Sequence, residues 1–213
     1  MRRVLFILIL FNTLRGAIVL DRIAVIVGKH VIKESDINRD LRMTGFLNRA
    51  PLSFSTMDKR QSAERLVDQE IIRQEIISGG YQRPAESEAN TLEAQLRKDR
   101  FGGSQTRLED ELTRYALTEK QLHDALLWQL TVLQFIDQRF RVGVIVTDEE
   151  IRAYYDQHAA ELRRQYPSNG SFEALEPKIR SLLEGRQVNQ NFEEWLKDAR
   201  NRYQIDYKQG AFQ

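Results

Sequence analysis

Three histidines, His30, His123 and His158, are the residues best suited to acid–base chemistry or to metal binding. They fall in what we expect to be three different secondary-structure elements, and no two of them have the spacing of metal ligands. Cysteine is absent, which excludes disulfides, thiol catalysis and cysteine-ligated metal. We therefore predict no catalytic residues, no metal site and no cofactor.

Two runs of acidic residues, 109–111 and 148–150, offer carboxylates close together in the sequence. The second run follows Thr147, and the pattern Thr-Asp-Glu-Glu is a capping box, so we interpret it as the first turn of a helix. The first run is interpreted as the solvated face of another helix. No nucleophile elbow, phosphate-binding loop or dinucleotide fingerprint occurs. The chain is therefore predicted not to be an enzyme.

Large apolar residues occur where the helical patterns break, which is unusual for loop segments. Most of them surround the break at residues 50–56, and one lies at a later helix end: Phe46, Leu47, Leu52, Phe54, Met57 and Phe101. These side chains either fold back into the core or line a groove for extended polypeptide, because exposed apolar patches mark interaction sites. They are our candidate substrate-binding residues. Trp128 and Trp195 lie on apolar stripes and are expected in the core.

The first 17 residues have the pattern of a secretory signal peptide. Arg2 and Arg3 precede an apolar run over residues 4–11. Arg15 ends that run too early for a transmembrane helix, which takes about 20 apolar residues. We therefore expect export to the periplasm, signal removal near residue 17 and no stable insertion in the membrane.

Charge is nearly balanced along the chain, with 32 basic and 31 acidic residues and a net charge of +1. Removal of residues 1–17 leaves 29 basic against 31 acidic residues, a net charge of −2. A near-neutral surface with interspersed charges gives no electrostatic reason to bind nucleic acid.

Apolar periodicity predicts a mainly helical fold with one small β-sheet. The β-branched run 23–27, a Gly28 turn and residues 31–32 are typical of a hairpin, and residues 205–207 alternate as a strand does. An isolated hairpin is marginal in water, so we expect the C-terminal strand to pair with it. Helices are predicted over 57–78, from Pro84 to 101, over 108–115, over 118–140, from 148 onward and from 172 to about 203.

Finer details of three of these helices also follow from the sequence. We expect Ser35 to cap the helix after the hairpin and Pro177 to lie in the first turn of the last helix. The helix over 118–140 is expected to carry one apolar stripe that reaches Phe140 and consists of Leu122, Leu126, Leu130, Leu133 and Ile136.

In four segments, in the same order, the chain resembles the SurA/PrsA/PpiC family of exported folding factors. Residues 20–37 are similar to the opening of the SurA N-terminal domain, a valine-rich hairpin followed by a Ser-Asp helix start. The long helix over 118–140, the run Val-Thr-Asp-Glu-Glu-Ile-Arg-Ala-Tyr-Tyr-Asp at 146–156 and the Phe-Glu-Glu-Trp-Leu-Lys segment at 192–197 also resemble the family.

The resemblance implies a single chaperone domain over residues 18–213. Within it, an N-terminal lobe spans 18–146, and residues 147–213 return to pack against that lobe. Family members often carry a parvulin domain before the last helix, which needs roughly 100 residues. The interval 157–172 is too short for one, so the family's isomerase residues have no counterparts here.

The resemblance further implies a holdase that works without ATP. It would bind unfolded, outer-membrane or secreted polypeptides through apolar surface. Two alternatives stay open: an adaptor that holds one specific folded partner, and a residual peptidyl-prolyl isomerase. A homodimer is also open.

Overall fold

The computed structural model describes residues 21–167 and 170–212, so the proposed signal peptide lies outside the described residues. The chain is mainly helical with one small antiparallel sheet. In order along the chain, the elements are β1 (Ile23–Val27), β2 (His30–Lys33), α1 (Glu34–Asn48), α2 (Thr56–Gly79), α3 (Glu86–Phe101), α4 (Gln105–Arg114), α5 (Glu119–Phe140), α6 (Asp148–Gln165), α7 (Phe172–Arg202), β3 (Ile205–Tyr207) and the 3₁₀ turn η1 (Gln209–Phe212).

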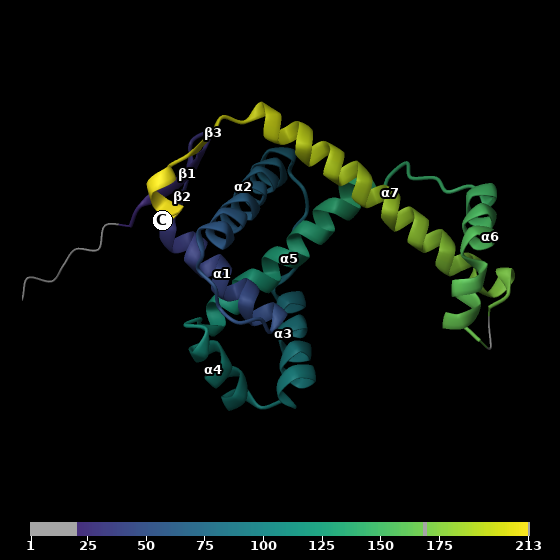
Figure 1. Cartoon of the computed structure of the whole chain (residues 1–213), viewed down its shortest axis with the longest axis horizontal. Coiled ribbons are helices and arrows are strands. Elements are labelled where there is room, and N and C mark those ends of the chain that lie inside the picture. The colour runs from purple at the N-terminus through teal and green to yellow at the C-terminus, as the bar shows by residue number, and fades with distance from the viewer. Residues whose placement is uncertain (1–20, 168–169, 213) are drawn as a thin grey trace, which may run out of the picture.

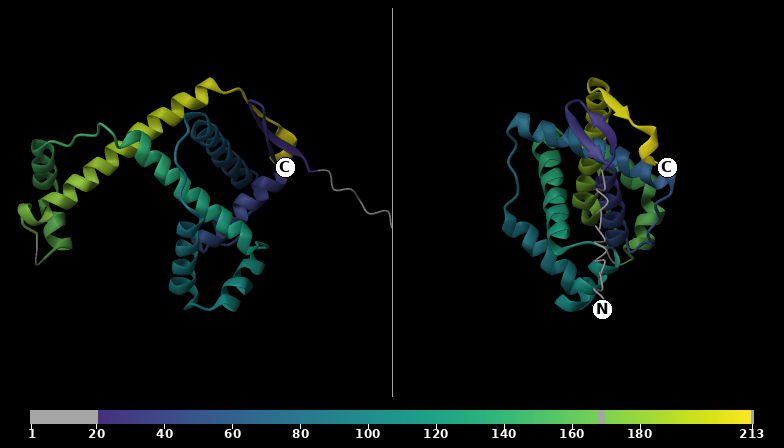
Figure 2. Two further views of the ribbon diagram at one scale, coloured as in Figure 1. Left: turned by 180° about the vertical axis from the view of Figure 1, so that it is seen from behind. Right: turned by 90° about the vertical axis from the view of Figure 1, so that its left-hand side faces the viewer.

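The two ends of the described chain meet in the sheet, whose strand order is β2-β1-β3. Val25 of the central strand lies opposite Ile32 on one side and Tyr207 on the other. Gly28 turns the hairpin with a positive φ of 58°, a conformation that glycine adopts readily. The views in Figures 1 and 2 place this sheet at one end of the molecule. The predicted pairing of the N-terminal hairpin with the C-terminal strand is confirmed.

The sheet is covered by helices and by the last residues of the chain. Val25 and Val27 are fully buried in a core that also contains Ile37 of α1 and Val67 of α2. Phe212 of η1 belongs to the same core, although no element was expected after β3. Burial of these apolar groups makes an otherwise marginal sheet stable.

Charged groups join the end of α7 to α2 beside the sheet. Arg200 donates hydrogen bonds to Glu64 and Asp68 of α2, and all three side chains are partly shielded from water. Burial is the main cause that raises the pKa of the neighbouring Tyr207 to about 12. The last helix is thereby fixed on the N-terminal part of the chain.

An aromatic cluster fixes α5 and α7 against α2 in the middle of the molecule. Phe135 of α5 is fully buried, and its ring centre lies 4.9 Å from that of Tyr81 and 5.4 Å from that of Trp195 on α7. Both contacts are edge-to-face, which is a favoured geometry for aromatic pairs. Trp195 is partly buried and packs against this core, so the prediction that it lies in the core is right in part.

The helices α3 and α4 form a separate corner that packs on α1 and α5 (Figure 1). Its core contains Leu108 and Leu112 of α4 together with Leu122 and Leu126 of α5. Phe46 at the end of α1 is part of this core. The corner therefore ties α1, α3, α4 and α5 into one body.

The first half of α7 extends away from this body and carries α6 (Figures 1 and 2). α6 packs extensively against α7 alone, around a small core that includes Ile151, Tyr155 and Ile179. Arg180 of α7 donates to the Val146 carbonyl at 3.0 Å and so holds the entry to α6. We call α6 and the first half of α7 the arm.

Four local predictions were wrong. α1 begins at Glu34 after Lys33, so Ser35 lies inside the helix, where its side chain contacts Asp21 instead of capping. α3 begins at Glu86, two residues after Pro84. Pro177 is the sixth residue of α7 and lies in the second turn, where proline removes one helical hydrogen bond.

The fourth wrong prediction is the apolar stripe of α5, because Leu133 is 63% exposed. The stripe contains Leu122 and Leu126 but does not continue through Leu133, because α5 changes partners from the α3–α4 corner to α2 and α7. In residues 21–167 and 170–212, no helix is both long and apolar enough to cross a bilayer.

Candidate functional site

Two adjoining hollows lie along α2 and α5. The first, of about 430 Å³, lies between α1, α2 and α5 and includes Leu47 and Leu66 in its wall. The second, of about 500 Å³, lies between α2, α5 and the start of α3 and includes Ile77 and Leu127. Arg73, Asp124 and Trp128 border both hollows. We call the combined depression the groove.

The helix periodicity explains why α2 and α5 present these side chains. On α2, Ile72 and Ile76 face the aromatic cluster, while Arg73 and Ile77, one residue further round, lie at the edge of that contact. On α5, Leu127 lies next to the buried Leu126 and is turned about 100° away from it. The groove is therefore the rim of two helix–helix contacts rather than a separately built pocket.

The walls of the second hollow are mainly apolar. Ile77 is 61% exposed there, next to Pro84 and Leu127. Thr131 also borders it, but its hydroxyl donates to the Leu127 carbonyl at 2.7 Å and is satisfied within the helix. An apolar side chain that packed against Ile77, Pro84 and Leu127 would therefore displace water from carbon.

Arg73 and Trp128 mark the place where the two hollows join. The guanidinium carbon of Arg73 lies 4.7 Å from the centre of the Trp128 ring, within the range of a cation–π contact. The Arg73 side chain is 47% exposed, and its ion pair with Glu70 is long, at 3.7 Å. Such a side chain can move without breaking a strong contact, which would uncover the indole face.

The carboxylates around the groove all have partners. Asp36 pairs with Arg39, and Asp40 pairs with Arg65. Asp124 lies 2.6 Å from Lys120. Glu86, the fourth, contacts a histidine.

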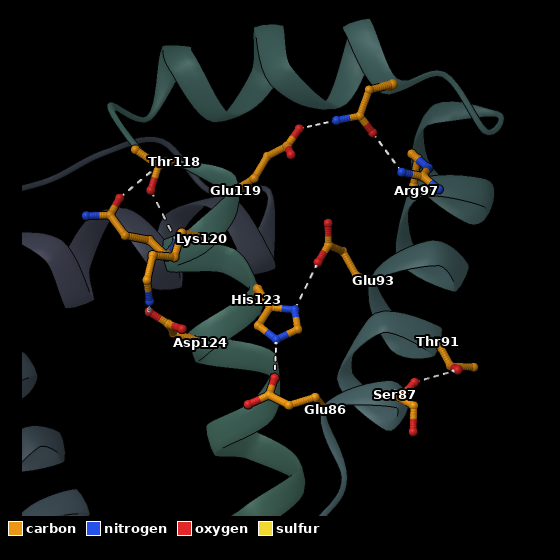
Figure 3. Close-up of polar contacts among 12 residues, drawn as sticks. Glu86, Ser87, Thr91, Glu93, Arg97, Thr118, Glu119, Lys120, His123 and Asp124 are labelled. Atoms are coloured by element: carbon orange, nitrogen blue, oxygen red, sulfur yellow. Dashed lines mark hydrogen bonds and ion pairs between the residues drawn. The ribbon is translucent and has the colours of Figure 1, made fainter.

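His123 of α5 precedes the groove residue Asp124, and its ring lies between Glu86 and Glu93 of α3 (Figure 3). Its Nε2 is 2.8 Å from Glu86 Oε2, and its Nδ1 is 3.4 Å from Glu93 Oε2. Only the doubly protonated ring can donate to both carboxylates. The contact with Glu86 is the main cause that raises the pKa of His123, and Glu93 adds to the effect against the opposing influence of burial.

The six candidate residues from the sequence do not form one surface. Phe46 is fully buried, stacked at 6.4 Å on Phe101 and covered by Arg100, so it cannot line an open groove. Phe101 is half-buried in the same core. For these two residues the interpretation as folded-back core side chains is the one the structure supports.

Leu47 lines the first hollow, and the remaining three candidates lie on the surface. Leu52, Phe54 and Met57 are exposed on the segment between α1 and α2 and at the start of α2. A Cβ on Gly45 would lie 3.1 Å from Leu52 Cδ2, so this segment folds closely onto α1. The structure thus brings together only part of the predicted set.

Sequence reasoning missed most of the groove residues, namely Arg73, Ile77, Arg83, Leu127 and, as a surface residue, Trp128. One signal was present in the sequence. Residues 126–128 are three consecutive large apolar residues on a helix, and successive residues are about 100° apart, so one core cannot accept all three. The excess apolar residues had to face a second core or a groove.

This arrangement provides apolar surface, one aromatic face and guanidinium donors. No group of three or more His, Asp and Glu in the described ranges has a geometry that could hold a metal ion. A scan against models of protein families and a search among curated proteins found no match to the chain.

Proposed function

We propose that the protein is an ATP-independent holdase that binds unfolded polypeptide in the groove along α2 and α5. The observation that carries this proposal is the pair of adjoining open hollows, the second of them with mainly apolar walls, that meet at the partly buried Trp128. The resemblance of residues 20–37 to the SurA opening and the signal-peptide pattern of residues 1–17 support action in the periplasm on secreted or outer-membrane clients.

The size of the groove is consistent with weak and reversible binding. Burial of one large aliphatic side chain contributes about 1.5–3 kcal/mol. An unfolded client loses conformational freedom when it is held, which offsets much of this gain. A few such contacts in shallow hollows would therefore hold a client and still release it without nucleotide.

The test compares two exposed isoleucines. Ile77→Glu places a charge inside the groove, whereas Ile145→Glu changes a residue that is 76% exposed outside it and serves as the matched control. Aggregation of a chemically denatured client is followed by light scattering at near-equimolar chaperone. We expect the parent chain and Ile145→Glu to suppress aggregation and Ile77→Glu to need roughly tenfold more protein, because one apolar contact is lost.

If both variants suppressed aggregation equally well, the groove would not be the client-binding site. Failure of the parent chain to suppress aggregation of several clients would contradict the holdase function itself. A single folded partner recovered at fixed stoichiometry would favour the adaptor. Acceleration of a proline-limited refolding reaction at catalytic amounts would favour residual isomerase activity, because the uncatalysed step takes tens of seconds or longer.

A further inference from the structure

Two arginines border the groove without a strong acidic partner. Arg83, between α2 and α3, makes no ion pair or hydrogen bond within the part of the chain that the structure describes, and it lies at the mouth of the second hollow. Arg73 has only the 3.7 Å contact with Glu70 and the cation–π contact with Trp128. Their donors are therefore open to a ligand.

The acidic side chains of the groove are in the opposite situation. Asp36, Asp40 and Asp124 each pair with a cation of the chain itself, and Glu86 contacts His123. A basic client side chain would have to compete with these internal pairs. An acidic client side chain would meet the guanidinium groups of Arg83 and Arg73. Binding there would break no internal ion pair except the long contact of Arg73 with Glu70.

From this asymmetry we infer that the groove selects apolar segments that carry a carboxylate side chain, with Arg83 and Arg73 as the selecting residues. The inference rests on the proposed function. The apolar client residues enter the hollow beside Ile77 and Leu127, and a nearby Asp or Glu lies against the guanidinium groups at the rim. A planar guanidinium can hold a carboxylate with two parallel hydrogen bonds, which favours it over a neutral amide.

Selectivity of this kind has a limited size. An ion pair at an exposed rim is partly screened by water and salt, so we expect a preference of about threefold to fivefold for a carboxylate over a neutral amide. The preference should shrink at high ionic strength, because the screening length falls from about 10 Å at 0.1 M salt to about 3 Å at 1 M.

The experiment uses three fluorescein-labelled peptides of about ten residues that share one apolar sequence and differ at a central Glu, Gln or Lys. Binding to the chain without residues 1–17 is measured by fluorescence anisotropy at low and high salt. We expect the Glu peptide to bind most tightly and the Lys peptide most weakly. Arg83→Gln should reduce the Glu preference, and Arg83→Glu should reverse the order of the Glu and Lys peptides.

Arg83 is well suited to substitution because it has no partner in the described residues whose loss would disturb folding. Arg107→Gln on α4, which changes an exposed arginine outside the groove, is the matched control and should leave the preference unchanged. Equal binding of the Glu and Gln peptides to the parent chain would overturn the inference while the holdase function stands. A Glu preference unaltered by both Arg83→Gln and Arg73→Gln would overturn the assignment. If none of the peptides binds, the proposed function fails as well.

Discussion

His123 is the one described histidine whose two ring nitrogens both face carboxylates, those of Glu86 and Glu93 on α3 (Figure 3). Its pKa is raised above the ordinary value of 6.5, so the folded chain favours the charged ring. A raised pKa contributes stability that is fully present below pH 6.5 and is lost as the pH rises through the folded-state pKa. The contact between α3 and α5 should therefore be strongest at mildly acid pH.

Replacement of His123 by Gln should lower the free energy of unfolding more at pH 6 than at pH 8.5. The side chain is partly shielded but Glu86 is largely exposed, so we expect a difference of about 0.5–1 kcal/mol between the two pH values. Urea unfolding monitored by circular dichroism measures it. The matched control is the same replacement in a chain that carries Glu86→Gln and Glu93→Gln, where the pH dependence should disappear. A parent-to-variant difference that is the same at both pH values would contradict the prediction.

Trp128 shows how a single residue can serve both the core and the surface. Part of it packs beside the aromatic cluster around Phe135, and the rest borders both hollows under Arg73. The expectation that Trp128 lies in the core was therefore only partly right. A helix that contacts two different partners has residues at the edge of each contact, and these residues form the groove.

Among the elements, the 3₁₀ turn η1 completes the sheet core. Phe212 is almost fully buried, and its ring centre lies 6.4 Å from that of Tyr207 on β3. It covers the sheet close to the chain's C-terminal end. The small sheet thus depends on residues beyond its own last strand.

Phe212→Ala should lower the free energy of unfolding by about 3 kcal/mol, because it removes a buried aromatic side chain and leaves a cavity. Val31→Ala is a suitable control, since Val31 lies in β2 but is exposed and should cost well under 1 kcal/mol. Thermal and urea unfolding give both values. Similar losses for the two variants would mean that η1 adds little to the sheet.

At the scale of the whole molecule, the arm projects from the body (Figures 1 and 2). Its core is separate from the three cores of the body, and α7 is the one long element shared by both. Structural units with separate cores open separately, with their own free energies. The arm is therefore expected to unfold locally before the body does.

Ile151→Ala tests this separation. Ile151 is fully buried in the arm, and its truncation should cost about 2–4 kcal/mol there. Hydrogen exchange followed by mass spectrometry should show faster exchange in α6 and the first half of α7, with unchanged protection in β1, α2 and α5. Ile145→Ala, at an exposed position just before α6, is the control. Faster exchange throughout the body would show that the arm and the body form one cooperative unit.

The sequence by itself determined the mainly helical fold, most helix boundaries and the pairing of the hairpin that begins at Ile23 with the strand Ile205–Tyr207. These features depend on local signals, such as the capping boxes at Thr118 and Thr147 and the turn at Gly28, which act over a few residues. Where a contact from outside the segment competed, as that of Asp21 with Ser35 does across 14 positions, the local prediction failed.

Only the tertiary structure decided which apolar residues form the groove. Phe46 and Phe101 lie in the α3–α4 corner, whereas Ile77 and Leu127 remain at the rim of two helix contacts. Helical periodicity tells which residues share a face, but not which partner covers that face or where its coverage ends. That depends on how α2 and α5 cross, which is set by contacts between residues far apart in the sequence.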